Sequence, residues 1–348
     1  RVLRLVEKAG SHTAHRWHFW YIFTIFPQLQ QRRGPRLLEG AEVGEMARRA
    51  PPETLALIRK DSGRGGKGHA FFEEESTLGN ELLVQVCRAL AATFPMVGYV
   101  QGMSFLVTFL LEVSGLRQAQ VHNFLAAFLT RPHSLYLGLY AANFPLLRFL
   151  SHLFRRALER VEPRAAAALA RLELPLELFL PKWFLSFFAA CLDKPLLLRA
   201  WDFIVVSDAA ALPIVAVGIV TQLRGVVLRG DFGQVSQVLQ EREQLNGHLA
   251  LQTLSAFLAD APRLFTAAWK GRVLAEYQTG LQEKEEFSPY FDSLRAHWAK
   301  EHPPQHLLQP PELIEEHARP KMFTFAELEP AVPPALQPAI PSNANERD

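Results

Sequence analysis

Cysteine is scarce in this sequence of 348 residues: only Cys87 and Cys191 are present, each inside an apolar run. We interpret both as reduced core residues of a cytoplasmic protein, with a disulfide as the alternative. No window supplies about 18 uncharged apolar residues, so we expect no transmembrane helix. The net charge of +2 is too small for a nucleic-acid-binding stripe or a polybasic membrane-binding surface.

Motifs for metal binding, nucleotide binding and nucleophilic catalysis are also incomplete. His12, His15 and His18 are spaced by three but have no acidic or cysteine partner, so we expect no metal site. The glycine-rich segment 63–69 lacks the spacing of a phosphate-binding loop, and Lys67 is followed by Gly instead of Ser or Thr. The sequence has no Gly-x-Ser-x-Gly turn. We therefore expect no cofactor of the chain's own.

Helical periodicity dominates what is present. Apolar residues of segment 121–129 recur at the spacing of one helix face, and segments 82–90 and 146–161 repeat the pattern. Residues 177–190 are apolar nearly all round and predict a central buried helix. The β-branched stretches near Ile204 and Val215 would suit strands, but Ala and Gly interrupt them. We predict an all-α fold.

The composition changes near the C-terminus. Residues 245–300 continue as predicted helices with mixed charge. Ten of the 24 prolines lie in the last 46 residues, so we predict a Pro-rich tail over 303–348 that is extended or disordered. The segment 61–68 carries four glycines and is predicted to be a loop.

Two short stretches carry residue types that suit chemistry on a phosphate group. Their fixed positions are Ile58, Asp61 and Arg64 in the first, and Tyr99, Gln101, Gly102 and Met103 in the second. A guanidinium makes planar, bidentate contacts with phosphate oxygens, and a glutamine amide both donates to and accepts from a water molecule. Taken singly, Arg64 also fits a solvated charge in a loop, and Gln101 fits a turn residue.

Together the stretches resemble the signatures Ile-x-x-Asp-x-x-Arg and Tyr-x-Gln-Gly-Met of the TBC family of Rab GTPase-activating proteins. Arg16 and Trp20 resemble the family's earlier Arg-x-x-x-Trp pattern. The family's later signature is matched at Trp183, Arg199, Trp201 and Asp202. The resemblance covers residues 10 to 235 approximately. It implies one multi-helix domain over 1–302, built from two helical subdomains.

The resemblance also implies a function on a partner protein. TBC domains stimulate GTP hydrolysis on Rab-family small GTPases, and the GTP and its Mg²⁺ are bound by the partner. Arg64 is then the arginine finger and Gln101 the glutamine finger. Asp61 is expected to hold the Arg64 guanidinium, Tyr99 to pack beside Gln101, and Gly102 to allow close backbone approach. The remaining signature residues are expected to be structural: Arg16, Trp20, Ile58, Met103, Trp183, Arg199, Trp201 and Asp202.

The same resemblance implies a monomer that regulates vesicle traffic and has no nucleic-acid partner. It would be cytoplasmic and reach membranes only through the GTPase. The sequence departs from the family at one place, because Gly65, Gly66 and Lys67 stand where the family has Thr-Phe-Pro. We expect the segment 62–68 to be poorly ordered for this reason. The alternative function is therefore a non-catalytic effector or scaffold that binds GTP-loaded Rab without efficient activation.

Overall fold

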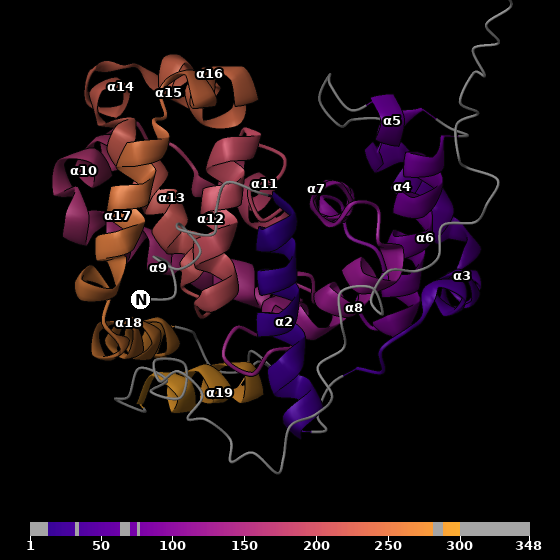
Figure 1. Ribbon diagram of the computed structural model, residues 1–348. Coiled ribbons are helices and arrows are strands. Elements are labelled where there is room, and N and C mark those ends of the chain that lie inside the picture. The colour runs from indigo at the N-terminus through magenta and orange to yellow at the C-terminus, as the bar shows by residue number, and fades with distance from the viewer. Residues whose placement is uncertain (1–12, 32–34, 63–69, 75–76, 281–287, 300–348) are drawn as a thin grey trace, which may run out of the picture. The chain divides into compact units, whose positions relative to one another are not determined.

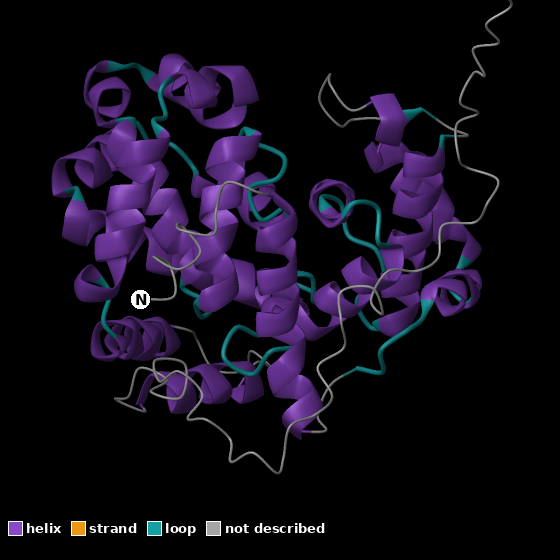
Figure 2. Cartoon of the chain, in the orientation of Figure 1, coloured by secondary structure: helices purple, strands orange, loops and turns teal. Residues whose placement is uncertain are grey.

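The computed structural model describes residues 13–31, 35–62, 70–74, 77–280 and 288–299, and the account below concerns these residues. All regular secondary structure within them is helical (Figure 2). The predicted all-α fold is confirmed for this part of the chain. The β-branched stretches near Ile204 and Val215 lie inside helices α12 and α13.

The first group of helices packs around α6 and α8 (Figure 1). Its members are α2 (Thr13–Gln31), α3 (Gly40–Arg48), α4 (Pro52–Ser62), α5 (Ala70–Glu73), α6 (Leu78–Thr93), α7 (Met103–Ser114) and α8 (Gln118–Leu129). Helix α6 contacts α3, α4, α5, α7 and α8. Thr77 begins α6, because its hydroxyl accepts the N–H of Asn80 at 3.2 Å and so caps the helix. This group contains both predicted finger stretches.

The second group packs around α9 and α13. Its members are η1 (Tyr136–Leu139), α9 (Pro145–Val161), α10 (Pro163–Arg171), η2 (Leu176–Leu178), α11 (Leu180–Leu185), α12 (Lys194–Val206), α13 (Ala211–Gln222), α14 (Arg224–Arg229), α15 (Phe232–Gln240), α16 (Arg242–Gly247), α17 (Leu251–Leu264), α18 (Ala267–Gly280) and α19 (Ser288–Ala299). Every residue of α13 from Ala211 to Val220 is buried. A helix that is apolar all round belongs in a core, and α13 lies between α9 and α17.

One hydrophobic core runs through both groups. Helix α2 contacts α12, and the rings of Trp20 and Trp201 lie 5.7 Å apart between their centroids. Asp202 fixes the same junction with both carboxylate oxygens. Its Oδ1 accepts the indole N–H of Trp20 at 3.1 Å, and its Oδ2 pairs with Nε of Arg16 at 3.1 Å. The two helical subdomains implied by the sequence therefore share a buried, satisfied polar contact.

The prediction of one central helix over 177–190 is wrong at both ends, because Leu176–Leu178 forms the 3-10 helix η2 and α-helix α11 extends only from Leu180 to Leu185. Helix α11 ends there, and Phe187 and Phe188 adopt left-handed backbone angles, with φ of 49° and 67°. The N–H of Phe188 donates to the carbonyl of Trp183 at 2.7 Å, which is the Schellman ending of a helix. Trp201 stabilises the turn, because its indole N–H donates to the Phe187 carbonyl at 3.2 Å. An unbroken apolar pattern does not reveal such a stop.

Helices α18 and α19 extend the core at the C-terminal end of the domain. The ring of Phe149 on α9 lies 5.7 Å from that of Phe291 and 6.1 Å from that of Trp298. Asp208, which follows α12, forms an ion pair with Lys270 of α18 and accepts the indole N–H of Trp298 at 2.8 Å. The predicted helices of 245–300 are thus found, apart from residues 281–287 and 300, which lie outside the described ranges.

The chain divides after Glu301, and the predicted Pro-rich tail over 303–348 lies outside the described residues. In the ranges given above, no helix combines the length and apolarity needed to cross a bilayer. Cys87 and Cys191 are both buried and unpaired by disulfide bonds, as predicted.

Candidate functional site: a carboxylate that joins the two signature stretches

Asp61 connects the two stretches that the sequence singled out. It lies in the last turn of α4, and only 3% of its surface is exposed. Its Oδ2 accepts three hydrogen bonds: from the Tyr99 hydroxyl at 2.6 Å, the Gly102 amide at 2.8 Å and the Ser104 hydroxyl at 2.8 Å. A buried carboxylate is stable only when such donors replace water. The start of the Arg64 segment is therefore tied to the turn that carries Gln101.

The hydroxyl of Tyr99 is a neutral donor in this arrangement. Burial raises the pKa of Tyr99 far above its ordinary value, and the Cys87 and Asp61 side chains raise it further. Burial also raises the pKa of the Cys87 thiol, with a smaller contribution from Asp61. Cys87 is consequently an inert core residue, and the proton between Tyr99 and Asp61 stays on the tyrosine.

The Gln101–Gly102 turn places one side chain outward and the next residue inward. Gln101 is exposed, whereas Gly102 is buried and begins α7 with a φ of 103°. That angle favours glycine, because a Cβ atom clashes in this region. No hydrogen bond joins the Gln101 side chain to another described residue. The amide is thus presented to solvent from a backbone that is fixed on its inner side.

Phe72 of α5 is anchored against α6. The Phe72 side chain is buried, and the backbone carbonyl of Phe72 accepts a hydrogen bond from the side-chain amide of Asn80 at 2.8 Å. Gly79 allows α5 and α6 to approach each other closely, because a Cβ on this residue would lie 2.4 Å from the carbonyl oxygen of Phe71. The described residues on either side of segment 63–69 are therefore both anchored, Asp61 by its carboxylate and Phe72 by its buried ring.

Arg64 itself lies within 63–69, outside the described residues, so its contact with Asp61 stays a prediction. The other oxygen of Asp61, Oδ1, is buried and has no hydrogen-bond partner in the described part of the chain. It is the acceptor that such a contact would use. The prediction of poor order over 62–68 falls on the same residues and is likewise left as a prediction, although Ser62 ends helix α4.

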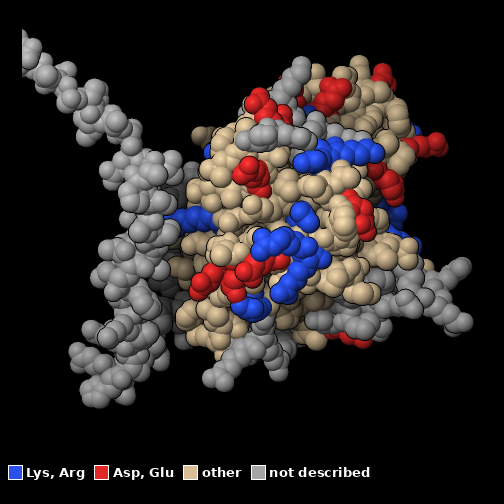
Figure 3. All heavy atoms as spheres, turned by 90° about the vertical axis from the view of Figure 1, so that its right-hand side faces the viewer, with Lys and Arg blue, Asp and Glu red and all other residues tan. Residues whose placement is uncertain are grey.

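The face formed by α3 to α6 carries charges of both signs. Figure 3 shows Lys and Arg side chains near the centre of this face with Asp and Glu side chains beside them. Exposed residues of α3 and α4 include Arg48, Lys60 and Glu53. Hydrophobic side chains are exposed there as well, because Leu57, Phe71 and Leu78 are about half accessible. Such a mixed surface suits a folded protein partner better than a polyanion.

The remaining signature residues lie in the core and hold its helices together. Ile58 and Met103 are buried beside the site. Trp183 donates its indole N–H to the Leu239 carbonyl at 3.2 Å, and Arg199 donates from Nε to the Ser255 hydroxyl at 3.1 Å. Asp202 pairs with Arg16, 186 residues away in sequence. None of these contacts involves the outward-facing Gln101.

Two residues of the site were missed by sequence reasoning. Ser104 supplies the third donor to Asp61, and Asn80 secures Phe72. Ser104 follows the Tyr-x-Gln-Gly-Met stretch directly, so a small hydroxyl residue at the start of a mostly apolar helix was the available signal. In the described ranges, no group of three His, Cys, Asp or Glu side chains is arranged to hold a metal ion.

Comparison with known proteins identifies the family. The Rab-GTPase-TBC domain model matches residues 13–228. Growth hormone-regulated TBC protein 6 of Caenorhabditis elegans is 28% identical over 155 residues, covering 44% of this chain and 45% of that protein. Human small G protein signaling modulator 3 is 32% identical over 158 residues, covering 43% of this chain and 20% of that protein. The chain thus spans less than half the length of either relative.

The fold has solved counterparts. The crystal structure of the Chlamydomonas flagellar RabGAP TBC domain matches with a TM-score of 0.59 at 19% sequence identity, covering 74% of this chain and 82% of that one. This likeness concerns the fold alone. The family model, by contrast, spans well over half of the chain and includes both signature stretches. The chain therefore belongs to the Rab-GTPase-TBC domain family.

Proposed function

We propose that this chain stimulates GTP hydrolysis on a Rab-family small GTPase by supplying two side chains in trans, Arg64 and Gln101. The observation that carries the proposal is the Asp61 carboxylate, whose Oδ2 accepts hydrogen bonds from Tyr99 and Gly102. Asp61 lies three residues before Arg64, and Gly102 follows Gln101. One buried group therefore fixes the base of both segments, while Gln101 stays exposed to a partner.

The two side chains suit the two requirements of the reaction. The attacking water must be oriented, and the charge on the transferring phosphoryl group must be neutralised. The Gln101 side chain can accept a hydrogen bond from that water through its carbonyl oxygen and donate one to a phosphate oxygen through its NH2 group. The Arg64 guanidinium can contact β- and γ-phosphate oxygens together. An arginine supplied in trans accelerates GTP hydrolysis by roughly 10³–10⁵ in well-studied GTPases.

Everything else that the reaction needs is brought by the partner. GTP and Mg²⁺ are bound in the GTPase, so this chain requires no cofactor. The chain would act as a monomer from the cytoplasm and would reach a membrane only when it binds a membrane-attached Rab protein. Regulation of vesicle traffic follows from that role, because hydrolysis ends the active state of the Rab protein.

A second candidate function is an effector or scaffold that binds GTP-loaded Rab with little activation. It is favoured by Gly65, Gly66 and Lys67, which replace the Thr-Phe-Pro that follows the finger in relatives. Ordering a glycine-rich segment costs roughly 1–2 kcal/mol per residue, and that cost would add to the barrier of hydrolysis. Binding would be affected less, since it depends on the wider surface of the domain.

The test is single-turnover GTP hydrolysis on a panel of purified Rab proteins, with and without the domain. Each Rab protein that responds is then measured with Arg64→Ala, which we expect to lower the stimulation by at least about 10²-fold, and with Arg64→Lys, which cannot make the bidentate contact. Arg48→Ala, an exposed arginine on α3, is the matched control. Binding of GTP-loaded Rab without any stimulation would favour the effector. Full stimulation by Arg64→Ala would remove Arg64 from the mechanism.

A further inference from the structure

The Gln101–Gly102 turn is held from two sides, and the second side comes from the other helical group. A Cβ built on Gly102 would lie 3.5 Å from the Cβ of Leu185 and 3.6 Å from its carbonyl carbon and oxygen. Leu185 is the last residue of α11, and α11 lies beside α7 in Figure 1. Gly102 is therefore enclosed between the Asp61 carboxylate and the backbone of Leu185.

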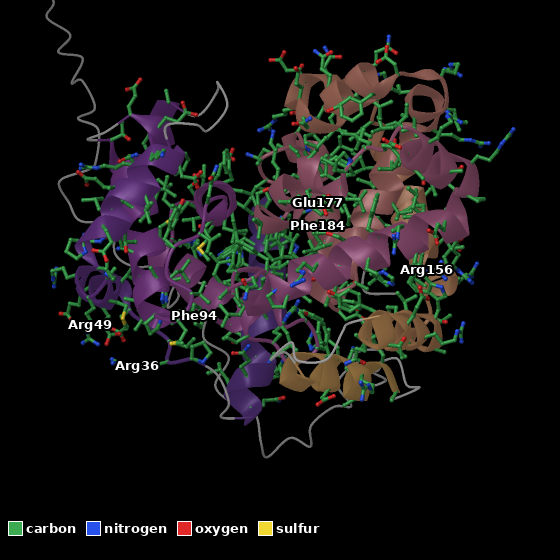
Figure 4. The ribbon with its side chains drawn as sticks, turned by 180° about the vertical axis from the view of Figure 1, so that it is seen from behind. Arg36, Arg49, Phe94, Arg156, Glu177 and Phe184 are labelled. Atoms are coloured by element: carbon green, nitrogen blue, oxygen red, sulfur yellow. The ribbon has the colours of Figure 1, made fainter. Side chains whose placement is uncertain are left out.

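Leu185 is itself fixed by Tyr140. The Tyr140 hydroxyl donates to the Leu185 carbonyl at 2.7 Å, and Tyr140 is only 3% exposed. Burial raises the pKa of Tyr140 far above its ordinary value, so the hydroxyl is a neutral donor. Because Leu185 ends its helix, this carbonyl lacks an intrahelical partner and depends on a side chain. Figure 4 labels the preceding residue, Phe184, on the same short helix.

We infer that Tyr140 is a positioning residue for the glutamine finger and acts through Leu185. The Tyr140 hydroxyl holds the Leu185 carbonyl, Leu185 limits the inward movement of Gly102, and Gly102 sets the direction of Gln101. Tyr140 touches neither the partner nor the nucleotide in this scheme. The expected effect of Tyr140 on hydrolysis rests on the proposed function. The effect of Tyr140 on the Gln101–Gly102 turn can be measured without a GTPase.

The chain offers a closely matched control. Tyr136 is buried at the start of the 3-10 helix η1, which Tyr140 follows directly, and it also donates to a backbone carbonyl, that of Asp208 at 3.0 Å. Burial is the main cause that raises the pKa of Tyr136 as well. Tyr136→Phe and Tyr140→Phe therefore remove the same group from similar surroundings, but only the second change releases a residue that contacts Gly102.

The first measurement is hydrogen exchange of the Gly102 amide, which donates to Asp61. The exchange rate at Gly102 is divided in each variant by the rate of amides in the α13 core, which corrects for global stability. After this correction, exchange at Gly102 should be at least about fivefold faster in Tyr140→Phe than in Tyr136→Phe. Leu185→Ile is a second variant, since it adds a branch on the Cβ atom nearest to Gly102 and leaves the Tyr140 hydroxyl in place. It should accelerate the same exchange. Equal exchange at Gly102 in Tyr140→Phe and Tyr136→Phe would overturn the inference.

The second measurement is hydrolysis on a responsive Rab protein. Tyr140→Phe should lower the maximal rate about tenfold with an unchanged dissociation constant for GTP-loaded Rab, and Tyr136→Phe should leave the rate unchanged. In a Gln101→Ala background, Tyr140→Phe should have no further effect on the rate. An additive loss in that background would contradict action through Gln101. If the wild-type domain stimulates no Rab protein, the proposed function fails, and the exchange measurement alone decides the role of Tyr140.

Discussion

The Oδ2 atom of Asp61 lies 2.8 Å from the amide nitrogen of Gly102, across 41 residues of sequence. The hydrogen bond places the C-terminal end of α4 against the N-terminal end of α7. Each end leads into one of the two segments assigned to chemistry, so neither segment can shift at its base without disturbing the other. This coupling makes Asp61 the first residue to test.

Asp61→Ala removes the acceptor of three hydrogen bonds and leaves buried donors on Ser104 and Gly102. We expect the free energy of unfolding to fall by about 2–4 kcal/mol, because unsatisfied buried donors cost about 1–3 kcal/mol each and the Tyr99 hydroxyl can rotate toward solvent. Urea unfolding followed by tryptophan fluorescence measures the loss. Ser104→Ala removes one donor and keeps the carboxylate, so it should cost about 1 kcal/mol. Equal losses in the two variants would show that the three bonds do not converge on Asp61 in solution.

Gln101→Ala should abolish most of the stimulation and leave the fold intact, because the side chain is exposed and the backbone is held by Gly102. We expect the partner's own catalytic glutamine to contribute less to hydrolysis here than it does in GTPases whose activation depends on that residue. The measurement is hydrolysis by a Rab protein lacking that glutamine, with wild-type domain and with Gln101→Ala. If the wild-type domain fails on this Rab protein while Gln101→Ala still activates the normal one, the two-finger mechanism is wrong.

Replacing Gly65, Gly66 and Lys67 with Thr, Phe and Pro should raise the maximal rate more than it changes binding. Ordering a residue costs roughly 1–2 kcal/mol, and 1.4 kcal/mol corresponds to about tenfold in rate. We therefore expect a 10- to 100-fold faster maximal rate, in order of magnitude, with a dissociation constant changed by less than about threefold. Titration with GTP-loaded Rab separates the two quantities. An unchanged rate would show that the glycines impose no ordering cost.

His133 should make the domain sensitive to mild acid. Burial, followed by the charges of Arg131 and His297, lowers the pKa of His133 from 6.5 to about 3, against a smaller opposing effect of Asp208. The unfolded chain therefore binds the proton at a higher pH than the folded domain does. Stability is complete above pH 6.5 and is lost as the pH falls toward 3, by at most about 1.4 kcal/mol per pH unit from this group. In His133→Gln the urea concentration at the unfolding midpoint should fall less between pH 7 and pH 4 than it does in the wild type. In His248→Gln, a change at an exposed site, it should fall as it does in the wild type. Parallel curves for the two variants would contradict a neutral His133.

Trp298→Ala should destabilise the whole domain, although Trp298 lies beyond the segment that matches the family model. The ring packs on Phe149, and the indole N–H donates to Asp208. Loss of a buried Trp costs about 3–5 kcal/mol. Trp298→Phe keeps the ring contact and loses one hydrogen bond, so it should cost about 1–2 kcal/mol. Thermal unfolding followed by circular dichroism compares the two, and an unchanged midpoint for Trp298→Ala would show that α19 is dispensable.

Periodicity was sufficient to predict helices over 82–90, 121–129 and 146–161, because one face of each is buried. The segment 146–161 is an example, and α9 follows it within one residue at its start. The stop after Leu185 was not predictable in this way. Phe187 and Phe188 are apolar and carry no glycine signal, and their left-handed angles are stabilised by tertiary contacts such as the indole of Trp201.

The sequence also predicted which stretches would lie together, but not the atoms that join them. Asp61 was expected to serve Arg64, three residues away, since local spacing is all that a sequence displays. Its observed donors come from Tyr99, Gly102 and Ser104, which only the packing of α4 against α7 brings within reach. The inferred role of Tyr140 could not be predicted either, because the sequence around a tyrosine in an apolar run does not show which group accepts its hydrogen bond.

The contact between Arg16 and Asp202 has a consequence for the order in which the domain can form. The two residues are 186 positions apart. At a synthesis rate of about 5–20 residues per second, α2 leaves the ribosome roughly 10–40 seconds before the segment that receives it. During that interval the indole of Trp20, fully buried in the finished domain, has no α12 to cover it. Helix α2 is then an exposed apolar segment on a nascent chain, and a chaperone that binds such segments could cover it until α12 has been made.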